Sequence, residues 1–231
     1  MARLNLVQQG AELAYLLLHD PEFRSRVRRE HLIAAGKQIP LKENIDLLYN
    51  LLDHGMEGYH FDFYVLSAAP VEMVQSALDG IIPADHIFGT EFAYCPNGEI
   101  ETVAGATAGY GKVARLEQLQ SDLQIGMDHV IYAGDGSSDL HAMLHVNKGE
   151  GLTIAVSESR NVTQVAKRTV LSSNALAMLV PILEEVLEWP PAQVREFFES
   201  HGFLVQEWAK VQTDWLTLRP AEAGLAQNAS A

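Results

Sequence analysis

The stretch that decides the fold runs over residues 130–139 and reads Val-Ile-Tyr-Ala-Gly-Asp-Gly-Ser-Ser-Asp. Its first four residues are apolar, which predicts a buried strand. Asp135 stands between two glycines directly after this strand, and a helical pattern begins at about Ser138. We therefore expect a strand, then a tight turn that presents a carboxylate, and then a helix.

The same alternation of strands and helices extends to both sides of this stretch. Short β-branched or aromatic runs predict further strands at 61–66, 86–88 and 152–156, and Asn97-Gly98 predicts a hairpin over 92–101. Strands that alternate with helices need crossover connections and form mainly parallel sheets. The predicted fold class is therefore α/β with a mainly parallel sheet, preceded by about 55 residues that are all helical.

Composition excludes several classes of protein. The 231 residues carry a net charge of −14, which argues against general binding to nucleic acid or to anionic membranes. A single cysteine, Cys95, rules out an internal disulfide. The longest apolar stretch is too short to cross a bilayer, and no convincing signal peptide is present. We expect a cytoplasmic protein of one domain, with at most a small appendage.

Four polar residues stand where ligands bind in parallel sheets, just beyond the carboxyl ends of strands or at the start of helices. Ser67 follows the first predicted strand, Lys112 opens a helix, and Asp135 and Asp139 follow the strand quoted above. A hydroxyl and an ammonium suit phosphate oxygens, and carboxylates suit magnesium. Taken singly, the serine fits a strand cap, the lysine a surface charge and Asp135 a hairpin turn. Taken together, they predict a site for phosphate and a divalent cation.

Three of these segments resemble motifs of a known family. Tyr64-Val65-Leu66-Ser67, Gly111-Lys112 and residues 130–139 are similar to motifs two, three and four of the haloacid dehalogenase superfamily, nearest to its phosphoserine-phosphatase-like branch. The resemblance covers about residues 40–170. It implies a three-layer Rossmannoid sandwich with a mainly parallel sheet and a small helical cap at the N-terminus.

The resemblance also implies a function. An aspartate would attack the phosphorus of a small phosphorylated metabolite, form an aspartyl-phosphate and release it to water, with Mg²⁺ as cofactor. Ser67 would donate to the phosphoryl group, and Lys112 would neutralise the phosphate and the nucleophile. Ala68 and Ser138 would also contact the phosphate or substrate.

Two aspartates are implied at the metal. The resemblance makes Asp135 a magnesium ligand. It gives Asp139 a place either in the metal shell or as the partner that supports Lys112.

The first motif of the family is absent. It is a strand that ends in Asp-x-Asp-Gly-Thr, carries both catalytic aspartates, and lies between the strands that end near Ser67 and Asp135. No two aspartates of this chain are two residues apart, and in the nearest match Val7 and Gln9 replace both of them. We find no nucleophile in this chain. Either Met1 is internal to a longer enzyme, or the protein is an inactive phosphate- or metabolite-binding relative.

The predicted organisation is a partial helical cap at 1–38, an α/β core at 39–218 and a flexible tail at 219–231. Aromatic residues at 197, 198 and 203 form either internal core or a homodimer contact. Charged residues of the cap are candidates for substrate selection: Arg24, Arg26, Arg28, Arg29 and Glu30.

Overall fold

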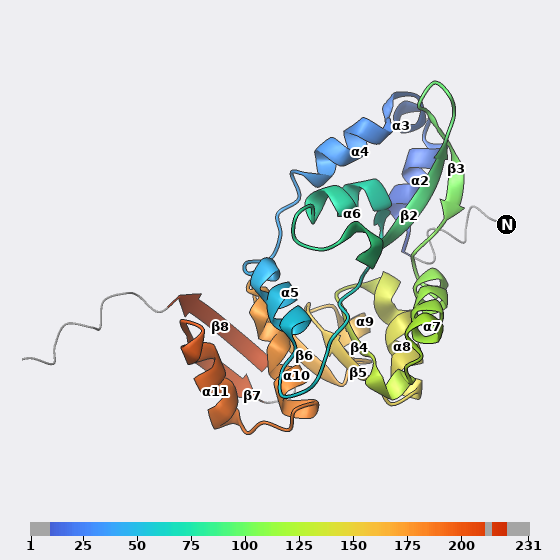
Figure 1. The fold of residues 1–231 in the computed structure, drawn as a ribbon. Helices are drawn as coiled ribbons and strands as arrows, with labels where there is room; N and C mark the ends of the chain where they lie inside the picture. Colours follow the sequence, from blue (N-terminus) through green and yellow to red (C-terminus); the bar gives the residue numbers. More distant parts are fainter. Residues whose placement is uncertain (1–9, 211–213, 221–231) are drawn as a thin grey trace, which may run out of the picture.

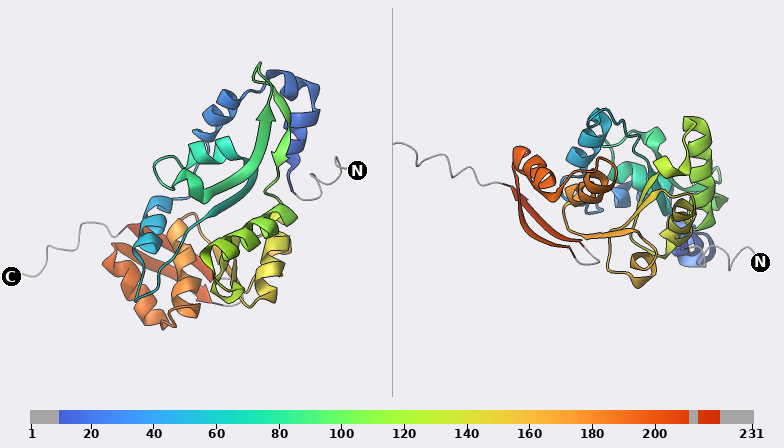
Figure 2. Two further views of the ribbon diagram at one scale, coloured as in Figure 1. Left: turned by 45° about the vertical axis from the view of Figure 1, so that its right-hand side comes forward. Right: turned by 90° about the horizontal axis from the view of Figure 1, so that it is seen from below.

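The computed structural model describes residues 10–210 and 214–220, which form two lobes (Figures 1 and 2). Strand β1 runs up from the junction between the lobes into the upper one. The strands are β1 (Val65–Pro70), β2 (Ile87–Tyr94), β3 (Ile100–Gly105), β4 (Ile131–Gly134), β5 (Leu152–Ala155), β6 (Arg168–Leu171), β7 (Phe203–Lys210) and β8 (Asp214–Pro220).

Helices make up most of the remaining described structure. The α-helices are α2 (Glu12–His19), α3 (Pro21–Arg26), α4 (Arg29–Gly36), α5 (Ile45–His54), α6 (Val71–Ala77), α7 (Tyr110–Leu123), α8 (Leu140–Lys148), α9 (Arg160–Thr163), α10 (Leu179–Glu185) and α11 (Pro191–Ser200). The short 3₁₀ turns are η1 (Ala84–His86), η2 (Met127–His129), η3 (Ser137–Asp139) and η4 (Ala175–Met178).

The strands form two sheets, in the orders β1-β2-β3 and β4-β5-β6-β8-β7. Pairing is parallel between β1 and β2 and from β4 through β8, and antiparallel in the hairpins β2–β3 and β7–β8. The predicted α/β class with mainly parallel pairing is therefore confirmed. β1 and β4 each end a sheet in the part of the chain that the structure describes.

Helices cover both faces of the larger sheet. Successive side chains of a strand point to opposite faces, and on β5 Ile154 belongs to one buried cluster while Ala155 belongs to another. The first cluster includes residues of α5, α10 and α11, and the second includes residues of α7, α8 and α9. This arrangement is the expected three-layer sandwich.

The upper lobe buries the helical start of the chain against the smaller sheet. Ala11, Ala14 and Leu17, at the start of and within α2, share a buried cluster with Phe92 and Ile100 of the β2–β3 hairpin. The hairpin predicted over 92–101 is thus present. The predicted boundaries at 38 and 218 stay a prediction, and most of the predicted tail lies outside the described residues.

Two sequence expectations change in the structure. The strand predicted at 61–66 is wrong by four residues, because parallel pairing with β2 begins only where Val65 meets Ile87. Ser67 therefore lies inside β1 and not beyond it. Of the aromatic residues that were candidates for a dimer contact, Phe198 and Phe203 are buried in the core, which favours the alternative of internal packing.

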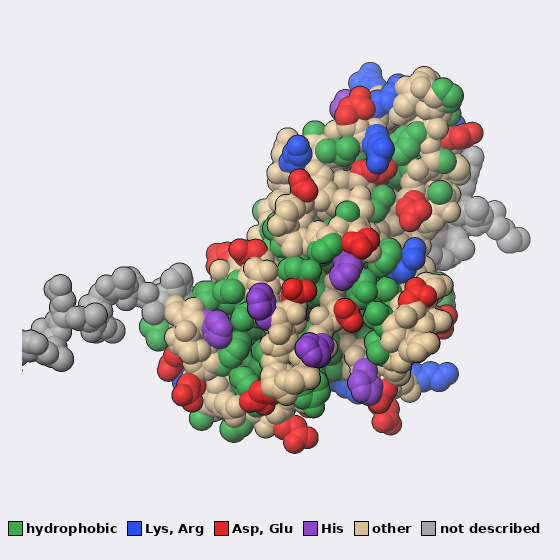
Figure 3. All heavy atoms as spheres, viewed as in Figure 1, with side chains coloured by type: hydrophobic (Ala, Val, Ile, Leu, Met, Phe, Trp, Pro, Cys, Tyr) green, Lys and Arg blue, Asp and Glu red, His purple; other side chains and the backbone are tan. Residues whose placement is uncertain are grey.

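The surface agrees with the composition. On the face drawn in Figure 3, acidic side chains are spread over both lobes and do not gather in one patch. Among the described helices, none combines the length and the apolarity that crossing a membrane requires.

Candidate active site

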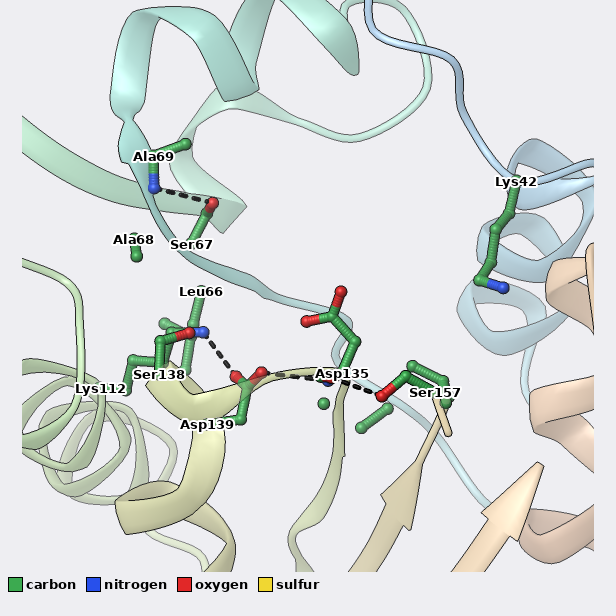
Figure 4. A pocket seen from close by; sticks show the side chains of 13 residues that line it. Lys42, Leu66, Ser67, Ala68, Ala69, Lys112, Asp135, Ser138, Asp139 and Ser157 are labelled. Carbon is green, nitrogen blue, oxygen red and sulfur yellow. Dashed lines mark hydrogen bonds and ion pairs between the residues drawn. The ribbon is translucent and has the colours of Figure 1, made fainter. Parts of the chain in front are cut away.

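A pocket of about 470 Å³ opens between the lobes, at the carboxyl ends of β4 and β5 and along β1 (Figure 4). This is the edge of a parallel sheet at which ligands bind. The structure brings every predicted site residue to its wall: Ser67, Ala68, Lys112, Asp135, Ser138 and Asp139. The roles assigned to them stay predictions, but their convergence in one cavity is a finding.

A buried ion pair forms the floor of this pocket. Lys112 donates from Nζ to Oδ1 of Asp139 at 2.6 Å, and both side chains are only 5% exposed. Lys112 lies in the first turn of α7, whose entry is shaped by Gly109 with φ +52 and by Gly111, where a Cβ would overlap the carbonyl oxygen of Ala106. The ammonium is thus fixed in place, with further N–H donors left for a ligand.

Asp139 has both carboxylate oxygens in use. Oδ1 also accepts from the hydroxyl of Tyr132 at 2.6 Å, and Oδ2 accepts from the backbone N–H groups of Asp135 and Gly136 at 3.1 Å. Burial by itself would raise the pKa of Asp139, but the Lys112 ammonium and these hydrogen bonds hold it below the ordinary value. This geometry favours the supporting role for Asp139 over that of a direct metal ligand.

The hydrogen bond between Tyr132 and Asp139 lowers the pKa of the aspartate and raises the pKa of the tyrosine. Burial raises the pKa of the Tyr132 hydroxyl, and the neighbouring Asp139 carboxylate raises it further. The hydroxyl therefore keeps its proton and remains a donor to Asp139.

Ser67 faces the pocket from β1. Its Oγ accepts a hydrogen bond from the N–H of Ala69 at 3.2 Å, so the hydroxyl proton is free to donate to a ligand (Figure 4). The carbonyl of its neighbour Ala68 accepts from Thr90 at 2.8 Å, which fixes this part of β1 against β2. Ser138 lies beside Lys112, and its backbone carbonyl accepts from the N–H of Gly109 at 3.1 Å (Figure 4).

Asp135 is the carboxylate of the pocket that can hold a cation. Its side chain is exposed and points into the cavity, and its backbone carbonyl accepts from Ser157 at 2.5 Å (Figure 4). No group of three or more metal-binding His, Cys, Asp or Glu side chains occurs among the described residues. Magnesium binds through one or two carboxylates together with water and phosphate oxygens, so Asp135 fits it as a single protein carboxylate.

Sequence reasoning missed two polar residues of the pocket. Ser157 comes two residues after β5, so the rule that found Asp135 could have found it too. Lys42 comes from the connection between α4 and α5, and no local signal in the sequence marks it.

The cap residues predicted to select the substrate do not line this pocket. Three of the arginines instead form ion pairs outside it. Arg26 pairs with Glu22 at 3.3 Å, and Arg28 pairs with Glu99 at the same distance. Arg29 approaches the buried Glu72 at 3.8 Å.

Comparison with known proteins identifies the family of this chain. A family model described as haloacid dehalogenase-like hydrolase matches residues 11–144, which include the segments around Ser67, Lys112 and Asp135. The chain belongs to this family. A search of curated proteins found no match for this haloacid dehalogenase-like chain.

A solved structure shares this fold. A phosphoserine phosphohydrolase-like protein from Francisella tularensis subsp. tularensis SCHU S4 is 21% identical, with a TM-score of 0.56. The match covers 78% of this chain and 82% of that protein. At this identity the likeness concerns the fold alone.

Proposed function

We propose that this site serves magnesium-dependent hydrolysis of a small phosphomonoester, as in the phosphoserine-phosphatase-like branch of the family. The observation that carries the proposal is the buried Lys112–Asp139 pair, which holds an ammonium next to Ser67 and Asp135 in one pocket. A phosphate dianion needs several donors that converge from different directions, and these residues provide them.

Each residue has a distinct task in this proposal. Ser67 donates its hydroxyl proton to one phosphoryl oxygen, and Lys112 donates to another and offsets the negative charge of the phosphate. Asp139 keeps Lys112 charged and oriented. Asp135 would hold magnesium, which would neutralise and polarise the phosphate when bound. Every group on this list acts by binding or by electrostatics.

The covalent step needs an aspartate outside this set. A carboxylate oxygen would form a bond to phosphorus as the bond to the leaving alcohol breaks, and water would then release inorganic phosphate. The 231 residues contain no Asp-x-Asp pair to supply it. We therefore expect these 231 residues to bind phosphate without turnover, and an active enzyme would need a nucleophile in addition to them.

The same absence favours a second candidate function, that of an inactive protein which binds phosphate or a phosphorylated metabolite. Both candidates require phosphate binding, and they differ in whether a nucleophile completes the site in the full protein. Sequencing the coding region upstream of Met1 separates them. An in-frame strand ending in Asp-x-Asp supports the enzyme, and a stop codon directly upstream supports the binding protein.

Calorimetric titration with inorganic phosphate in the presence of magnesium tests phosphate binding, which both candidate functions require. Ser67→Ala removes one donor to a charged acceptor, so we expect about tenfold weaker binding or more. Ser200→Ala is the matched control, because its hydroxyl donates to Phe197 on α11, away from the pocket. Equal affinities for wild type and Ser67→Ala would contradict the proposed phosphate site.

Hydrolysis of p-nitrophenyl phosphate tests the expected lack of turnover. We expect no magnesium-dependent release of nitrophenol above the uncatalysed rate. Clear magnesium-dependent turnover that Asp135→Asn abolishes and Asp128→Asn preserves would show that expectation to be wrong. Asp128 is the control because it is exposed and lies outside the pocket.

A further inference from the structure

Lys42 is a second cation of the pocket, and it comes from a different part of the chain than Lys112. In Figure 4 it stands on the far side of the cavity from Ser67 and Lys112, with Asp135 between them. Residues from β1 and α7 thus form one end of the cavity, and Lys42 marks the other.

Tertiary contacts hold Lys42 in this position. Its Nζ donates to the carbonyl of Ser172 at 2.5 Å, across 130 residues of sequence. The next residue, Glu43, donates its N–H to the carbonyl of Ser173 at 3.2 Å and accepts from the N–H of Ala175 at 2.8 Å. The lysine side chain and the backbone of the residue that follows it are therefore both fixed to the loop that follows β6.

The charge of Lys42 is not offset. Lys112 is paired with Asp139, whereas Lys42 has no ion-pair partner among the described residues. An ammonium has three N–H donors, and the Ser172 carbonyl takes one of them. Two donors and a full positive charge thus remain at the wall of the cavity.

We propose that Lys42 is a specificity-determining residue that binds a second anionic group of the ligand, at the end opposite the phosphate. This inference rests on the proposed function, because it assumes that Ser67 and Lys112 bind the phosphate. A carboxylate and a second phosphate share the chemistry that an ammonium recognises. A ligand with a neutral tail gains nothing from this contact.

Three probes measure the contribution of the second anion by calorimetric titration. Ethyl phosphate carries no second anion, phosphoglycolate carries a carboxylate, and ethylene glycol bisphosphate carries a second phosphate. We expect wild type to bind at least one of the last two more tightly than ethyl phosphate. The ligand that gains more identifies the anion that Lys42 prefers.

Lys42→Gln keeps the length of the side chain close to that of lysine and removes its charge. We expect it to weaken binding of the preferred probe with two anionic groups by about two- to fivefold, which is typical of an exposed charge contact, and to leave binding of ethyl phosphate unchanged. Lys42→Arg should retain most of the preference, and far-UV circular dichroism should be the same for all variants.

Lys167→Gln is the matched control. Lys167 is also exposed and also donates from Nζ to one carbonyl, that of Glu150 at 3.0 Å, but it does not line the pocket. An equal loss in Lys167→Gln would mean that only net charge matters and would overturn the inference. So would an unchanged preference in Lys42→Gln. If wild type binds neither ethyl phosphate nor inorganic phosphate, the proposed function itself fails.

Discussion

Single residues of the pocket divide into those that hold the site and those that face the ligand. Lys112 and Asp139 are buried and paired with each other, and Asp139 also accepts from Tyr132 and from backbone N–H groups. Ser67 directs its hydroxyl donor to the cavity, and Asp135 directs its carboxylate there. Changes to the first pair should therefore act on stability as well as on ligand binding, and changes to the second mainly on ligand binding.

Removing the charge of Lys112 should destabilise the protein strongly. Lys112→Met leaves the Asp139 carboxylate buried without its counter-ion, and breaking a buried pair in this way costs about 3–5 kcal/mol. Urea denaturation measures the free energy of unfolding. The double variant Lys112→Met/Asp139→Asn removes both charges and should recover part of the loss. A cost below about 1 kcal/mol for the single variant would refute this account of the pair.

The stability of the protein should fall in acid through Asp139. Its folded-state pKa is lowered from the ordinary 3.8, so the folded state favours the ionised carboxylate. This contribution is complete above the unfolded-state pKa and is lost as the pH falls through the folded-state value. Unfolding free energies of wild type and Asp139→Asn should therefore converge as the pH drops below about 4. A constant difference between them down to pH 2 would contradict the assignment.

At the scale of elements, the turn after β4 positions Asp139. Gly134 ends the strand so close to Asp139 that an added Cβ would lie 2.6 Å from the Cβ of that residue. Gly136, two residues on, has open space at the same position and a negative φ of −146. An added methyl group would therefore clash at Gly134 and would fit at Gly136.

Gly134→Ala should displace Asp139 and cost about 1–3 kcal/mol, the usual effect of overpacking a filled site. It should also weaken phosphate binding, because Lys112 is paired with Asp139 and would move with it. Gly136→Ala is the matched control and should change stability by no more than about 0.5 kcal/mol. Thermal unfolding and phosphate titration measure both effects. Similar behaviour of the two variants would show that this close approach does not position the site.

Elements were predicted well where their signal is local. The Gly-Asp-Gly turn after β4, the hairpin after β2 and the helix that begins near Lys112 all occur. The strand predicted at 61–66 failed because its aromatic run has β propensity but, among the residues that the structure describes, meets no pairing partner before Val65. No strand was predicted at β6, β7 or β8. The four-residue β6 takes its pairing from β5 and β8 on either side.

At the scale of the molecule, the pocket lies where the two sheets approach each other. β1 ends the smaller sheet and β4 ends the larger one in the described part of the chain, and residues of both line the cavity. The strand that the family resemblance predicts between them would satisfy the unpaired backbone groups of both edges. That strand would bring the missing aspartates to the same pocket, and it stays a prediction.

The sequence by itself determined the α/β class, the order of most elements and the residues Ser67, Lys112, Asp135 and Asp139, because hydrophobic periodicity and turn chemistry are local properties. Only the tertiary structure decided that Asp139 supports Lys112 and that Lys42 stands at the far wall. The first depends on four hydrogen bonds that converge on one carboxylate. The second depends on a contact across 130 residues. Contacts of this kind arise from how the sheets and helices pack, and no short stretch of sequence encodes them.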